Sequence, residues 1–589
     1  MDAINPPQTL WDRAMAMQAE GRRPQAIEMV RVHLRLRPKD ADAISLMGVL
    51  LQGAGELEES ERWLRRAIAM SPGNAAAHNN LGVTLSYAGR REEAIAAWEH
   101  AVRIHPRYPL PWISLTSSYA QVNRADDGID AGRRAIDLSP DVPAAYSNTA
   151  FALFQAGQVQ DASAVAWRAV ELMPQEPRLF SSYLGMLNYS SRPLEEVLAA
   201  HRAFGSACVV RKPPAVTSPA PDRPLRIGIL SGDLRDHSVG FFAESLVDGR
   251  PPDVEAIAFL TSMHPSSDAH GVRIRSRFDR VVDAWTLSDA ALDEAIRAER
   301  IDVLIDLSGH TGGNRLTALA SKPAPVIVTA IGYPNTTGLP AVDWRVVDSI
   351  TDPPGAEAFC TERLLRLDPC FLCYRPPDLD VEPSMPASGP VTFGSFNNSA
   401  KIGAECTALW ARVLRAAPGS RLLVKTQTLA DPACRQAIRR RLAEAGIAED
   451  RVELVAQASK RAEHLALYGR VHVALDSIPY NGTTTTCEAL WMGVPVVALR
   501  GDRHASRVSA SLLSAAGHPE WVAEDADGFV RIASTLVGDM PRLGAIRATL
   551  REELRASPLL DSAAYSRRFH AAMRDCWREW CASHRPSGR

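Results

Sequence analysis

The first third of the chain repeats itself with a period of 34 residues. Prolines mark this period at Pro38, Pro72, Pro106, Pro140 and Pro174. Glycines, with one asparagine among them, keep the same spacing at Gly21, Gly55, Gly89, Asn123 and Gly157. Alanines form a third series at Ala67, Ala101, Ala135 and Ala169. A period of this length is typical of stacked helix pairs, in which each pair buries its apolar face against the next.

The three series mark different parts of one helix pair. A glycine or asparagine suits the turn between the two helices, where a left-handed backbone is often needed. An alanine suits the second helix where a neighbouring helix approaches closely, and the proline ends that helix. About five such tetratricopeptide units fit the chain, so we expect an α-solenoid over residues 7–190, with a further helix covering the last unit.

A proline-rich stretch separates this array from a region with a different pattern. Residues 211–226 contain five prolines and cannot form a helix or a central strand, which predicts a linker over 211–224. Strand-like apolar runs then alternate with helical patterns, at 225–231, 254–260, 301–308 and 325–332. After a second proline-rich break at 374–390, further runs follow at 391–398, 421–427, 451–456, 471–476 and 495–501. This alternation predicts two lobes, 225–380 and 390–580, each with a parallel sheet and ligands at the carboxyl ends of its strands.

Composition and sequence pattern disfavour several classes of protein. A net charge of −2 disfavours a nucleic-acid binder, which would carry a surplus of basic residues. The N-terminus does not resemble a secretory signal, and no apolar stretch approaches the ~20 residues that cross a bilayer, so we expect a cytoplasmic protein without a membrane span. Cys370 and Cys373 have C-x-x-C spacing without a second pair, which favours two half-buried thiols over a metal site. We expect neither a metal nor a cofactor.

The strongest local constellation lies at residues 476–499. A strand ends at Asp476, a loop follows, and the run Thr483, Thr484, Thr485 and Thr486 leads into a helical segment that contains Glu488. Hydroxyls and free backbone N–H groups at a helix N-terminus form a ready site for an anion. The segment therefore predicts a phosphate or nucleotide site, with a simple capping motif as the alternative.

Three other strand ends carry polar residues. In 393–402 a strand leads to Asn397 and Asn398 and then to Lys401, an ammonium that can neutralise a departing phosphate. His237 follows the first strand of the first lobe and can act as an acid or a base. His310 follows another strand in a loop of small residues. For each of them the plainer interpretation is a solvated lysine or a hydrogen-bonded turn histidine.

Taken together, these segments resemble a known family. The motifs are IDLSGHTGGNRL (305–316), KPAPVIVTAIGYPNTTGLPAVDWRVVDSITDPPG (322–355), LDPCFLCYRPP (367–377), VTFGSFNNSAKI (391–402) and YNGTTTTCEALWMGVPVVALRGDRHASRV (480–508). They are similar to the SPINDLY and O-GlcNAc transferase family, glycosyltransferase family 41, in a bacterial form. The resemblance runs from about residue 224 to 580, and family members also carry N-terminal tetratricopeptide repeats.

The resemblance implies a GT-B fold with two Rossmann-like lobes and inverting, metal-independent transfer of a sugar to serine or threonine of a protein. It implies roles for Lys401 at the donor diphosphate, Asn398 beside the nucleotide, Thr483 to Thr486 around the phosphates and Glu488 on the ribose. His464 would lie near the base, with local spacing one residue longer than in O-GlcNAc enzymes. His237 corresponds to the active-site histidine discussed as base or acceptor-positioning residue.

The resemblance also implies partners. The family lines the groove of its array with asparagines that hold a peptide backbone, and the matching positions here are Asn80, Ser114 and Asn148, so this ladder is partial. The alternative is that these residues are polar positions on a solvated helix face. The expected partners are a protein or peptide acceptor and a nucleotide sugar, and the array also permits a homodimer.

The donor is open at this point. UDP-N-acetylglucosamine is expected from the broad family. O-GlcNAc transferases carry a histidine where this chain has Thr483, and the threonine run looks more like SPINDLY, whose plant members use GDP-fucose. Some bacterial relatives modify flagellin with other sugars. A non-catalytic scaffold with a degenerate transferase domain is a further alternative, disfavoured because the lysine, the threonine run and the acidic residue are intact.

Overall fold

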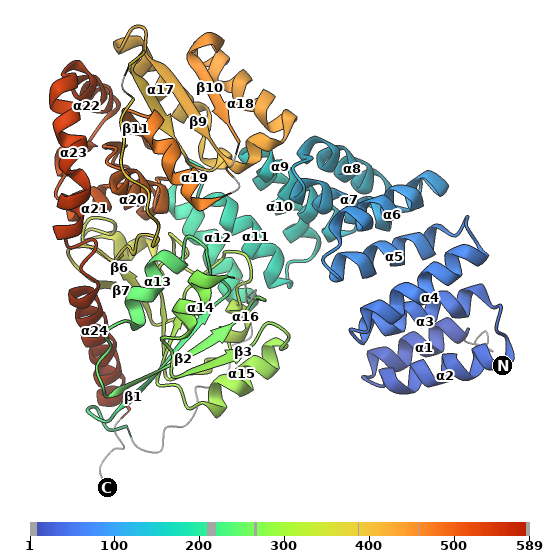
Figure 1. Cartoon of the computed structure of the whole chain (residues 1–589). Coiled ribbons are helices and arrows are strands. Elements are labelled where there is room, and N and C mark those ends of the chain that lie inside the picture. Colours follow the sequence, from blue (N-terminus) through green and yellow to red (C-terminus); the bar gives the residue numbers. More distant parts are fainter. Residues whose placement is uncertain are drawn as a thin grey trace. The chain divides into compact units, whose positions relative to one another are not determined.

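The computed structural model describes residues 9–208, 219–263, 268–386, 388–456, 458 and 460–584 (Figure 1). The chain forms two compact units, Met1–Gln155 with Ala164–Leu172, and Ala156–Ser163 with Met173–Arg589. Each unit is considered by itself. The predicted linker at 211–224 lies outside the described residues as far as position 218.

The N-terminal region consists of antiparallel helix pairs, as the 34-residue period predicts. The helices are α1 (Leu10–Ala19), α2 (Arg23–Leu36), α3 (Ala41–Gly53), α4 (Leu57–Met70), α5 (Ala75–Tyr87), α6 (Arg91–Ile104), α7 (Pro109–Gln121), α8 (Ala125–Leu138), α9 (Pro143–Gln155) and α10 (Val159–Leu172). Every proline of the first series stands two residues after the second helix of a pair. The repeat array is thereby confirmed.

The turns between paired helices show why the second series needs glycine. Gly21, Gly55, Gly89 and Gly157 have φ between 73° and 83°, in the left-handed region. Asn123, which replaces glycine in the fourth unit, has φ 59°. Asparagine is among the few other residues that adopt this conformation at modest cost. The alanines of the third series are at most 1% exposed, so no larger side chain fits there.

Two helices and a seven-stranded parallel sheet begin the second unit. The helices are α11 (Pro177–Leu187) and α12 (Leu194–Ala207). The strands are β1 (Leu225–Ser231), β2 (Val254–Leu260), β3 (Arg280–Asp283), β4 (Val303–Asp306), β5 (Val326–Thr329), β6 (Trp344–Val347) and β7 (Arg363–Arg366), in the order β3-β2-β1-β4-β5-β6-β7. Between them lie α13 (Gly240–Val247), α14 (Ala269–Arg275), α15 (Asp289–Ala298), α16 (Leu316–Leu319) and the short η1 (Ala356–Phe359).

A second parallel sheet follows, with six strands in the order β10-β9-β8-β11-β12-β13. Its strands are β8 (Thr392–Ser395), β9 (Arg421–Lys425), β10 (Val452–Val455), β11 (Val473–Leu475), β12 (Val496–Leu499) and β13 (Val522–Ala523). Its helices are α17 (Ala404–Ala416), α18 (Pro432–Glu444), α19 (Arg461–Ala466), α20 (Thr484–Trp491), α21 (Val508–Ala515), α22 (Ala526–Gly538), α23 (Met540–Ala556) and α24 (Ser562–Ser583). Short 3₁₀ turns are η2 (Ser399–Lys401), η3 (Gln427–Ala430), η4 (Glu449–Arg451), η5 (Leu467–Arg470), η6 (His504–Ser506) and η7 (Pro519–Trp521). Two parallel-sheet lobes of this kind confirm the predicted architecture.

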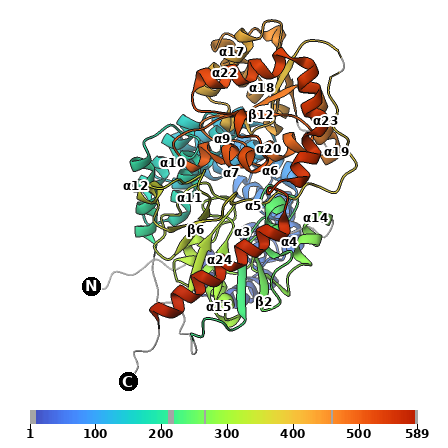
Figure 2. The same ribbon diagram turned by 90° about the vertical axis from the view of Figure 1, so that its left-hand side faces the viewer.

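The last helix packs on the first lobe, although it follows the second in sequence. In Figure 2, α24 lies across the lobe that contains β2. Its Tyr565 donates a hydrogen bond to the Phe371 carbonyl at 2.8 Å, and Trp577 donates to the Ala220 carbonyl at 3.1 Å. Arg574 binds the Arg223 carbonyl at 2.6 Å. The end of the region 390–580 therefore belongs by packing to the first lobe.

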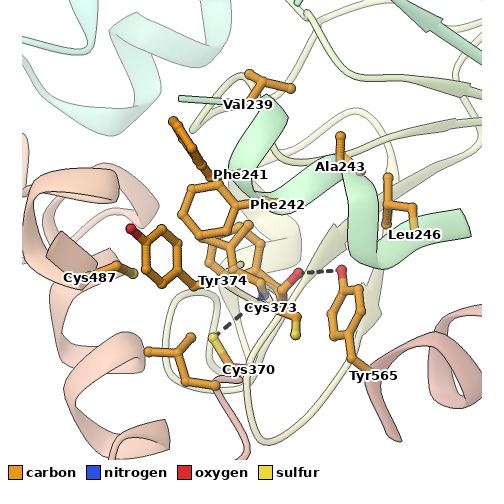
Figure 3. Close-up of a cluster of buried hydrophobic side chains, with 14 of the residues drawn as sticks. Val239, Phe241, Phe242, Ala243, Leu246, Cys370, Cys373, Tyr374, Cys487 and Tyr565 are labelled. Carbon is orange, nitrogen blue, oxygen red and sulfur yellow. Dashed lines mark hydrogen bonds between the residues drawn. The ribbon is translucent and has the colours of Figure 1, made fainter. Parts of the chain in front are cut away.

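The segment between the lobes is part of a continuous apolar core. Tyr374 is fully buried beside Phe242 of α13, and Cys487 of α20 lies in the same cluster (Figure 3). Cys370 and Cys373 are each 1% exposed, so the expectation of half-buried thiols is wrong. Burial raises the pKa of Cys373 to about 11 and that of Cys370 further. Both thiols therefore stay protonated, apolar members of this core.

Candidate functional site

The two segments expected to bind an anion leave neighbouring strands of the second lobe. Along the order of its sheet, the direction of the connections reverses between β8 and β11. β8 ends at Ser395 and is followed by the segment to Lys401, while β11 ends at Leu475 and is followed by the threonine run. A parallel sheet opens a crevice beyond the carboxyl ends of its strands at such a reversal. The topology therefore brings both segments to one place.

The two asparagines of the first segment differ in what they do. Asn397 is buried, and its Oδ1 accepts a hydrogen bond from Thr485 Oγ1 at 3.0 Å, which ties the two segments together. Asn398 is exposed, and its Oδ1 accepts the Ala400 N–H at 3.0 Å as the cap of η2. Asn397 thus positions the threonine run, and Asn398 shapes the turn that carries Lys401.

Lys401 is half-buried beside the loop that leads into α20. Its Nζ donates a hydrogen bond to the Asn481 carbonyl at 2.6 Å and lies 3.8 Å from the centroid of the Tyr480 ring. Burial lowers the pKa of Lys401 to about 8, against the opposing charge of Asp476. An ammonium has three N–H donors, and Asn481 takes one of them. A phosphate oxygen would accept another and stabilise the positive charge.

Asp476 fixes the loop between Lys401 and the threonine run. Its carboxylate is 2% exposed, and Oδ1 accepts the N–H groups of Ser477 at 2.8 Å and Gly482 at 2.7 Å. A Cβ on Gly482 would lie 2.6 Å from Thr486 Oγ1 and 2.7 Å from Thr485 Oγ1, so a larger residue would displace the hydroxyls. The loop thereby sets where α20 begins.

The four threonines make different contacts. Thr483 is the residue before α20, and its side chain makes no capping hydrogen bond. Thr485 binds Asn397, and Thr486 Oγ1 lies 3.0 Å from Ser509 Oγ. Thr484 Oγ1 is buried without a hydrogen-bond partner among the described residues. Because the first N–H groups of a helix have no partner within it, this end of α20 presents several donors, which favours an anion site over a simple cap.

Glu488, one turn into α20, lies in a cluster of cationic side chains. Its Oε1 is 2.5 Å from Arg461 Nη2, and its Oε2 is 2.9 Å from His464 Nε2. Lys425 Nζ donates to His464 Nδ1 at 2.8 Å, so the proton of a neutral His464 is on Nε2, facing Glu488. Burial alone raises the pKa of Glu488, but the hydrogen bond from His464 and the neighbouring charges outweigh it and the pKa is lowered. Both oxygens are already bonded, so a ribose hydroxyl would have to share or replace these partners.

His237 lies in the loop after β1, at the corresponding reversal between β1 and β4 in the first sheet. Its Nδ1 accepts a hydrogen bond from the Val239 N–H at 3.3 Å and lies 3.5 Å from Asp233 Oδ1. Burial is the main cause that lowers its pKa, with Asp233 opposing. A neutral imidazole that accepts the Val239 N–H at Nδ1 carries its own proton on Nε2, and the other tautomer, with Nδ1–H facing Asp233, leaves Nε2 able to accept a proton.

Arg461 connects this loop with the Glu488 cluster. Its Nη1 is 3.6 Å from Asp236 Oδ1, and its guanidinium lies 4.2 Å from the centroid of the Phe241 ring. Asp236 precedes His237 in sequence. One arginine thus joins residues from both lobes, which places the loop of His237 beside the Glu488 cluster.

His310 does not join the other predicted residues. It is 4% exposed, with Nδ1 2.9 Å from Ser181 Oγ and Nε2 2.8 Å from the Thr337 carbonyl. A carbonyl can only accept, so Nε2 carries the proton, and both ring nitrogens are occupied. Through these two bonds the side chain links α11 to the loop after β5, and a substrate-binding role for His310 stays a prediction.

The residues predicted for an acceptor groove lie at one position of the array. Asn80, Ser114 and Asn148 are each the sixth residue of the first helix in a pair, and all three are half-buried. Asn148 Nδ2 donates to the Ile113 carbonyl at 2.8 Å, and Asn80 Oδ1 accepts from Asn79 Nδ2 at 3.3 Å. A role in holding a peptide stays a prediction.

Sequence reasoning did not find several side chains of this site. Lys425 and Arg461 surround Glu488 and His464, and Tyr480 stacks beside Lys401. Lys425 lies at the carboxyl end of β9, next to β8, and a lysine at that strand end could have indicated a binding residue from the sequence. Arg461 and Tyr480 carry no comparable pattern, since each acts through a partner from a distant segment.

Two surveys cover the described residues. In that part of the chain, no three or more His, Cys, Asp or Glu side chains gather in an arrangement that could hold a metal ion. Nor does any helix there have both the length and the apolar character needed to cross a membrane.

Comparison with known proteins agrees with this geometry. The model of Glycosyl transferase family 41 matches residues 205–373 and 384–569, and a tetratricopeptide-repeat model matches residues 41–71 and 75–107. The chain is 37% identical over 415 residues to the probable UDP-N-acetylglucosamine–peptide N-acetylglucosaminyltransferase SPINDLY of Arabidopsis thaliana, covering 68% of this chain and 45% of that protein. The protein of the same name from Solanum lycopersicum is also 37% identical, with 68% and 44% covered. The match spans less than half the length of these curated relatives.

A solved structure extends the likeness to the fold. A mutant form of the Thermobaculum terrenum O-GlcNAc transferase has a TM-score of 0.81 and 34% identity, covering 87% of this chain and 99% of that one. The family model matches more than half of the residues of this chain, and the chain therefore belongs to glycosyl transferase family 41.

Proposed function

We propose that this protein transfers a sugar from a nucleotide sugar to a serine or threonine hydroxyl of a polypeptide, with inversion at the sugar carbon and without a metal. The proposal depends chiefly on one observation, the convergence of Lys401 and the N-terminus of α20 at the reversal point of the second sheet. An ammonium beside a helix N-terminus favours the diphosphate more strongly as negative charge develops on it.

In this mechanism the acceptor oxygen attacks the sugar carbon as the bond from that carbon to the diphosphate breaks. Nε2 of His237 accepts the hydroxyl proton once the ring proton is on Nδ1, where the Asp233 carboxylate 3.5 Å away stabilises it. Lys401, the Thr484 hydroxyl and the first N–H groups of α20 stabilise the departing diphosphate. Glu488 and His464 hold the nucleoside, with Arg461 and Lys425 in support.

We propose UDP-N-acetylglucosamine as the donor. The names of the plant relatives and of the Thermobaculum structure, read as statements about those proteins, support this choice. The acceptor is proposed to be a polypeptide bound by the repeat array, because arrays of this type present an extended binding surface.

A thermal-shift panel tests the donor. UDP-N-acetylglucosamine, GDP-fucose and a CMP-sugar are titrated separately into the full chain. A ligand at ~100 times its Kd stabilises the folded state by about 2.7 kcal/mol, which is readily measured. We expect the UDP-sugar to raise the melting temperature and Lys401→Ala to weaken that effect. Stabilisation by GDP-fucose alone would replace the proposed donor, and no shift with any of the three would contradict nucleotide-sugar binding.

A further inference from the structure

The catalytic unit contains a second cavity, of about 230 Å³. Its walls come from α12, the loop after β5, the segment between β6 and β7, and the loop after β12. It shares no lining residue with the pocket beside Asn397, Asp476 and Thr485. Leu194, Val197 and prolines supply apolar surface, and Arg345, Asp352 and His504 supply polar groups.

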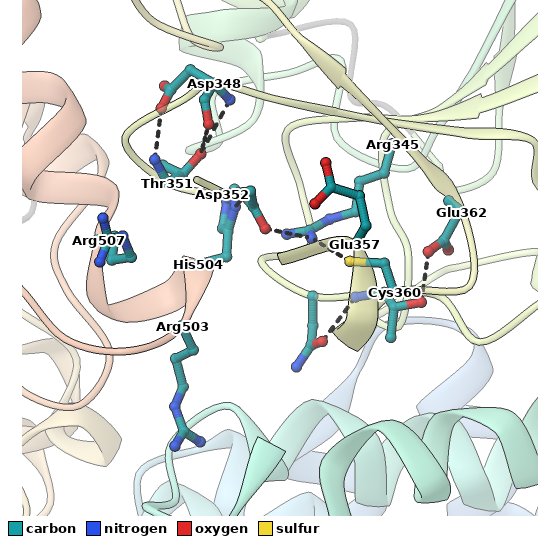
Figure 4. Close-up of polar contacts among 12 residues, drawn as sticks. Arg345, Asp348, Thr351, Asp352, Glu357, Cys360, Glu362, Arg503, His504 and Arg507 are labelled. Carbon is teal, nitrogen blue, oxygen red and sulfur yellow. Dashed lines mark hydrogen bonds and ion pairs between the residues drawn. The ribbon is translucent and has the colours of Figure 1, made fainter. Parts of the chain in front are cut away.

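Arg345 is a buried cation with an unused donor. Its side chain is 4% exposed, and Nη1 donates to Asp352 Oδ1 at 3.2 Å and to Cys360 Sγ at 3.5 Å (Figure 4). Its Nη2 is buried and has no hydrogen-bond partner among the described residues. A buried donor without a partner is unfavourable, so a ligand atom that accepts a hydrogen bond from it is stabilising.

His504 offers the complementary group on the other side of the same carboxylate. Its Nδ1 lies 2.5 Å from Asp352 Oδ2, and Figure 4 shows the two side chains together. Since the carboxylate accepts, Nδ1 carries the proton of a neutral ring and Nε2 is an acceptor. No hydrogen bond to that Nε2 occurs within the described part of the chain. Asp352 thus fixes two neighbouring side chains in position. Arg345 offers Nη2 as a donor, and His504 offers Nε2 as an acceptor.

Cationic and anionic groups are interspersed around this pair. Asp352, Asp348 and Arg345 face His504, and Glu362 acts on Arg345. On the loop of His504, Arg507 acts on Asp352 and Asp348, and Arg503 is paired with Asp502. Burial is the main cause that lowers the pKa of His504, so the ring is neutral at pH 7. Because Asp352 and Glu362 both act on Arg345, the pair presents no surplus positive charge for an anionic ligand.

A hydroxyl group accepts one hydrogen bond and donates another, which is the combination that Arg345 Nη2 and His504 Nε2 require. We propose that this cavity is a binding site for a neutral polyhydroxy ligand, a free sugar or a polyol, held by Arg345 and His504 against the apolar wall of α12. The proposal is independent of the transfer reaction, because it uses none of the residues placed around Lys401.

Saturation-transfer NMR tests the site on the full chain. Glucose and glycerol are titrated as the sugar and polyol probes, with benzoate and inorganic phosphate as anionic counterparts. Arg345→Lys keeps a positive charge for Asp352 but loses the planar fork. We expect at least tenfold weaker binding of the neutral probe in this variant. Arg363→Lys, an exposed arginine on the neighbouring strand β7, is the matched control and should bind as wild type does.

A second variant keeps the test decisive if Arg345→Lys fails to fold. His504→Phe preserves a ring beside Phe371, removes the acceptor and should also weaken the neutral probe at least tenfold. In wild type, binding should be constant from pH 8 to 7 and be lost in acid as His504 gains a proton. The proposal is overturned if wild type gives no saturable signal with either neutral probe, if both variants bind as wild type does, or if only the anions bind in an Arg345-dependent way.

Discussion

Lys401 shows how position changes the chemistry of a single residue. Burial lowers its pKa to about 8, yet the side chain remains largely protonated at pH 7 and keeps a hydrogen bond to Asn481. A group of this kind gains most from a partner whose negative charge grows during the reaction. The prediction that Lys401 supports a leaving group therefore concerns the rate of reaction more than the affinity for the ground state.

Lys401→Ala should lower kcat by about 10²–10³, the range for a lost stabiliser of transition-state charge. The melting temperature should change little, because the substitution removes a partly desolvated cation. Steady-state kinetics of donor consumption measures the effect, and Lys39→Ala, at an exposed position of the array, is the control. Near-normal turnover in Lys401→Ala would remove this role.

His237 is the residue for which pH gives the clearest evidence. A base must be unprotonated, and burial lowers the pKa of His237 below its ordinary value. The acid limb of the kcat/KM profile should therefore lie below pH 6.5, with activity lost as pH falls through the lowered pKa. His237→Gln should lower transfer by about 10²–10⁴ and leave nucleotide affinity unchanged. A variant with reduced nucleotide affinity and an unchanged pH profile would point to a structural role instead.

At the scale of elements, α20 concentrates several functions in eight residues. Its first turn lies at the carboxyl end of β11, where Thr485 binds Asn397 and Thr486 lies beside Ser509. One turn later, Glu488 binds the cationic side chain of Arg461. The hydroxyls of Thr485 and Thr486 thus have structural partners, and that of Thr484 has none among the described residues. The four threonines are therefore not equivalent, although they are identical in sequence.

Thr484→Val keeps the β-branched shape and removes this hydroxyl. Nucleotide affinity should fall by about 1–2 kcal/mol, the value of a lost hydrogen bond to a charged group. Isothermal titration with the nucleoside diphosphate measures the loss. Thr407→Val, at a buried threonine of α17 in the same lobe, should leave this affinity unchanged. Equal affinities in Thr484→Val and wild type would assign the run to capping.

The elements also show where sequence reasoning succeeds and where it does not. Runs with clear apolar patterns, such as β1 and β12, were predicted at their positions. β3 is largely exposed and β7 carries arginines at both ends, so neither has the apolar run on which the prediction relied. A binding role was expected for His310 because its strand-end loop looks like an active-site loop. Nothing local shows that Ser181 of α11 returns to cover it.

At the scale of the whole molecule, the chain divides into a repeat array and a two-lobed catalytic unit. The periodicity of the array made its fold predictable almost residue by residue. Contacts between segments far apart in sequence were not predictable, including α24 on the first lobe and Arg461 between the lobes. The domain limits 7–190, 225–380 and 390–580 remain proposals, since α11 and α24 pack with the first lobe.

Deleting residues 1–140 tests the division of labour between the two units. The truncated chain keeps α9 to α12 and should retain donor affinity and slow hydrolysis of the nucleotide sugar. Glycosylation of a full protein substrate should fall steeply and that of a short peptide much less, because remote binding energy acts on acceptors long enough to reach the array. Equal losses for protein and peptide, measured as kcat/KM, would mean that the array stabilises the fold without holding the acceptor.

The central claim is transfer of a sugar to a protein hydroxyl, and labelled transfer measures it directly. The full chain is incubated with tritiated UDP-N-acetylglucosamine and a polypeptide substrate, and protein-bound label is then treated with mild alkali. We predict label on the polypeptide, its release by β-elimination from serine or threonine, and a loss of about 10²–10³ in rate with Lys401→Ala. Donor hydrolysis with no protein-bound label for any polypeptide or nucleotide sugar, or label that resists alkali, would contradict the account.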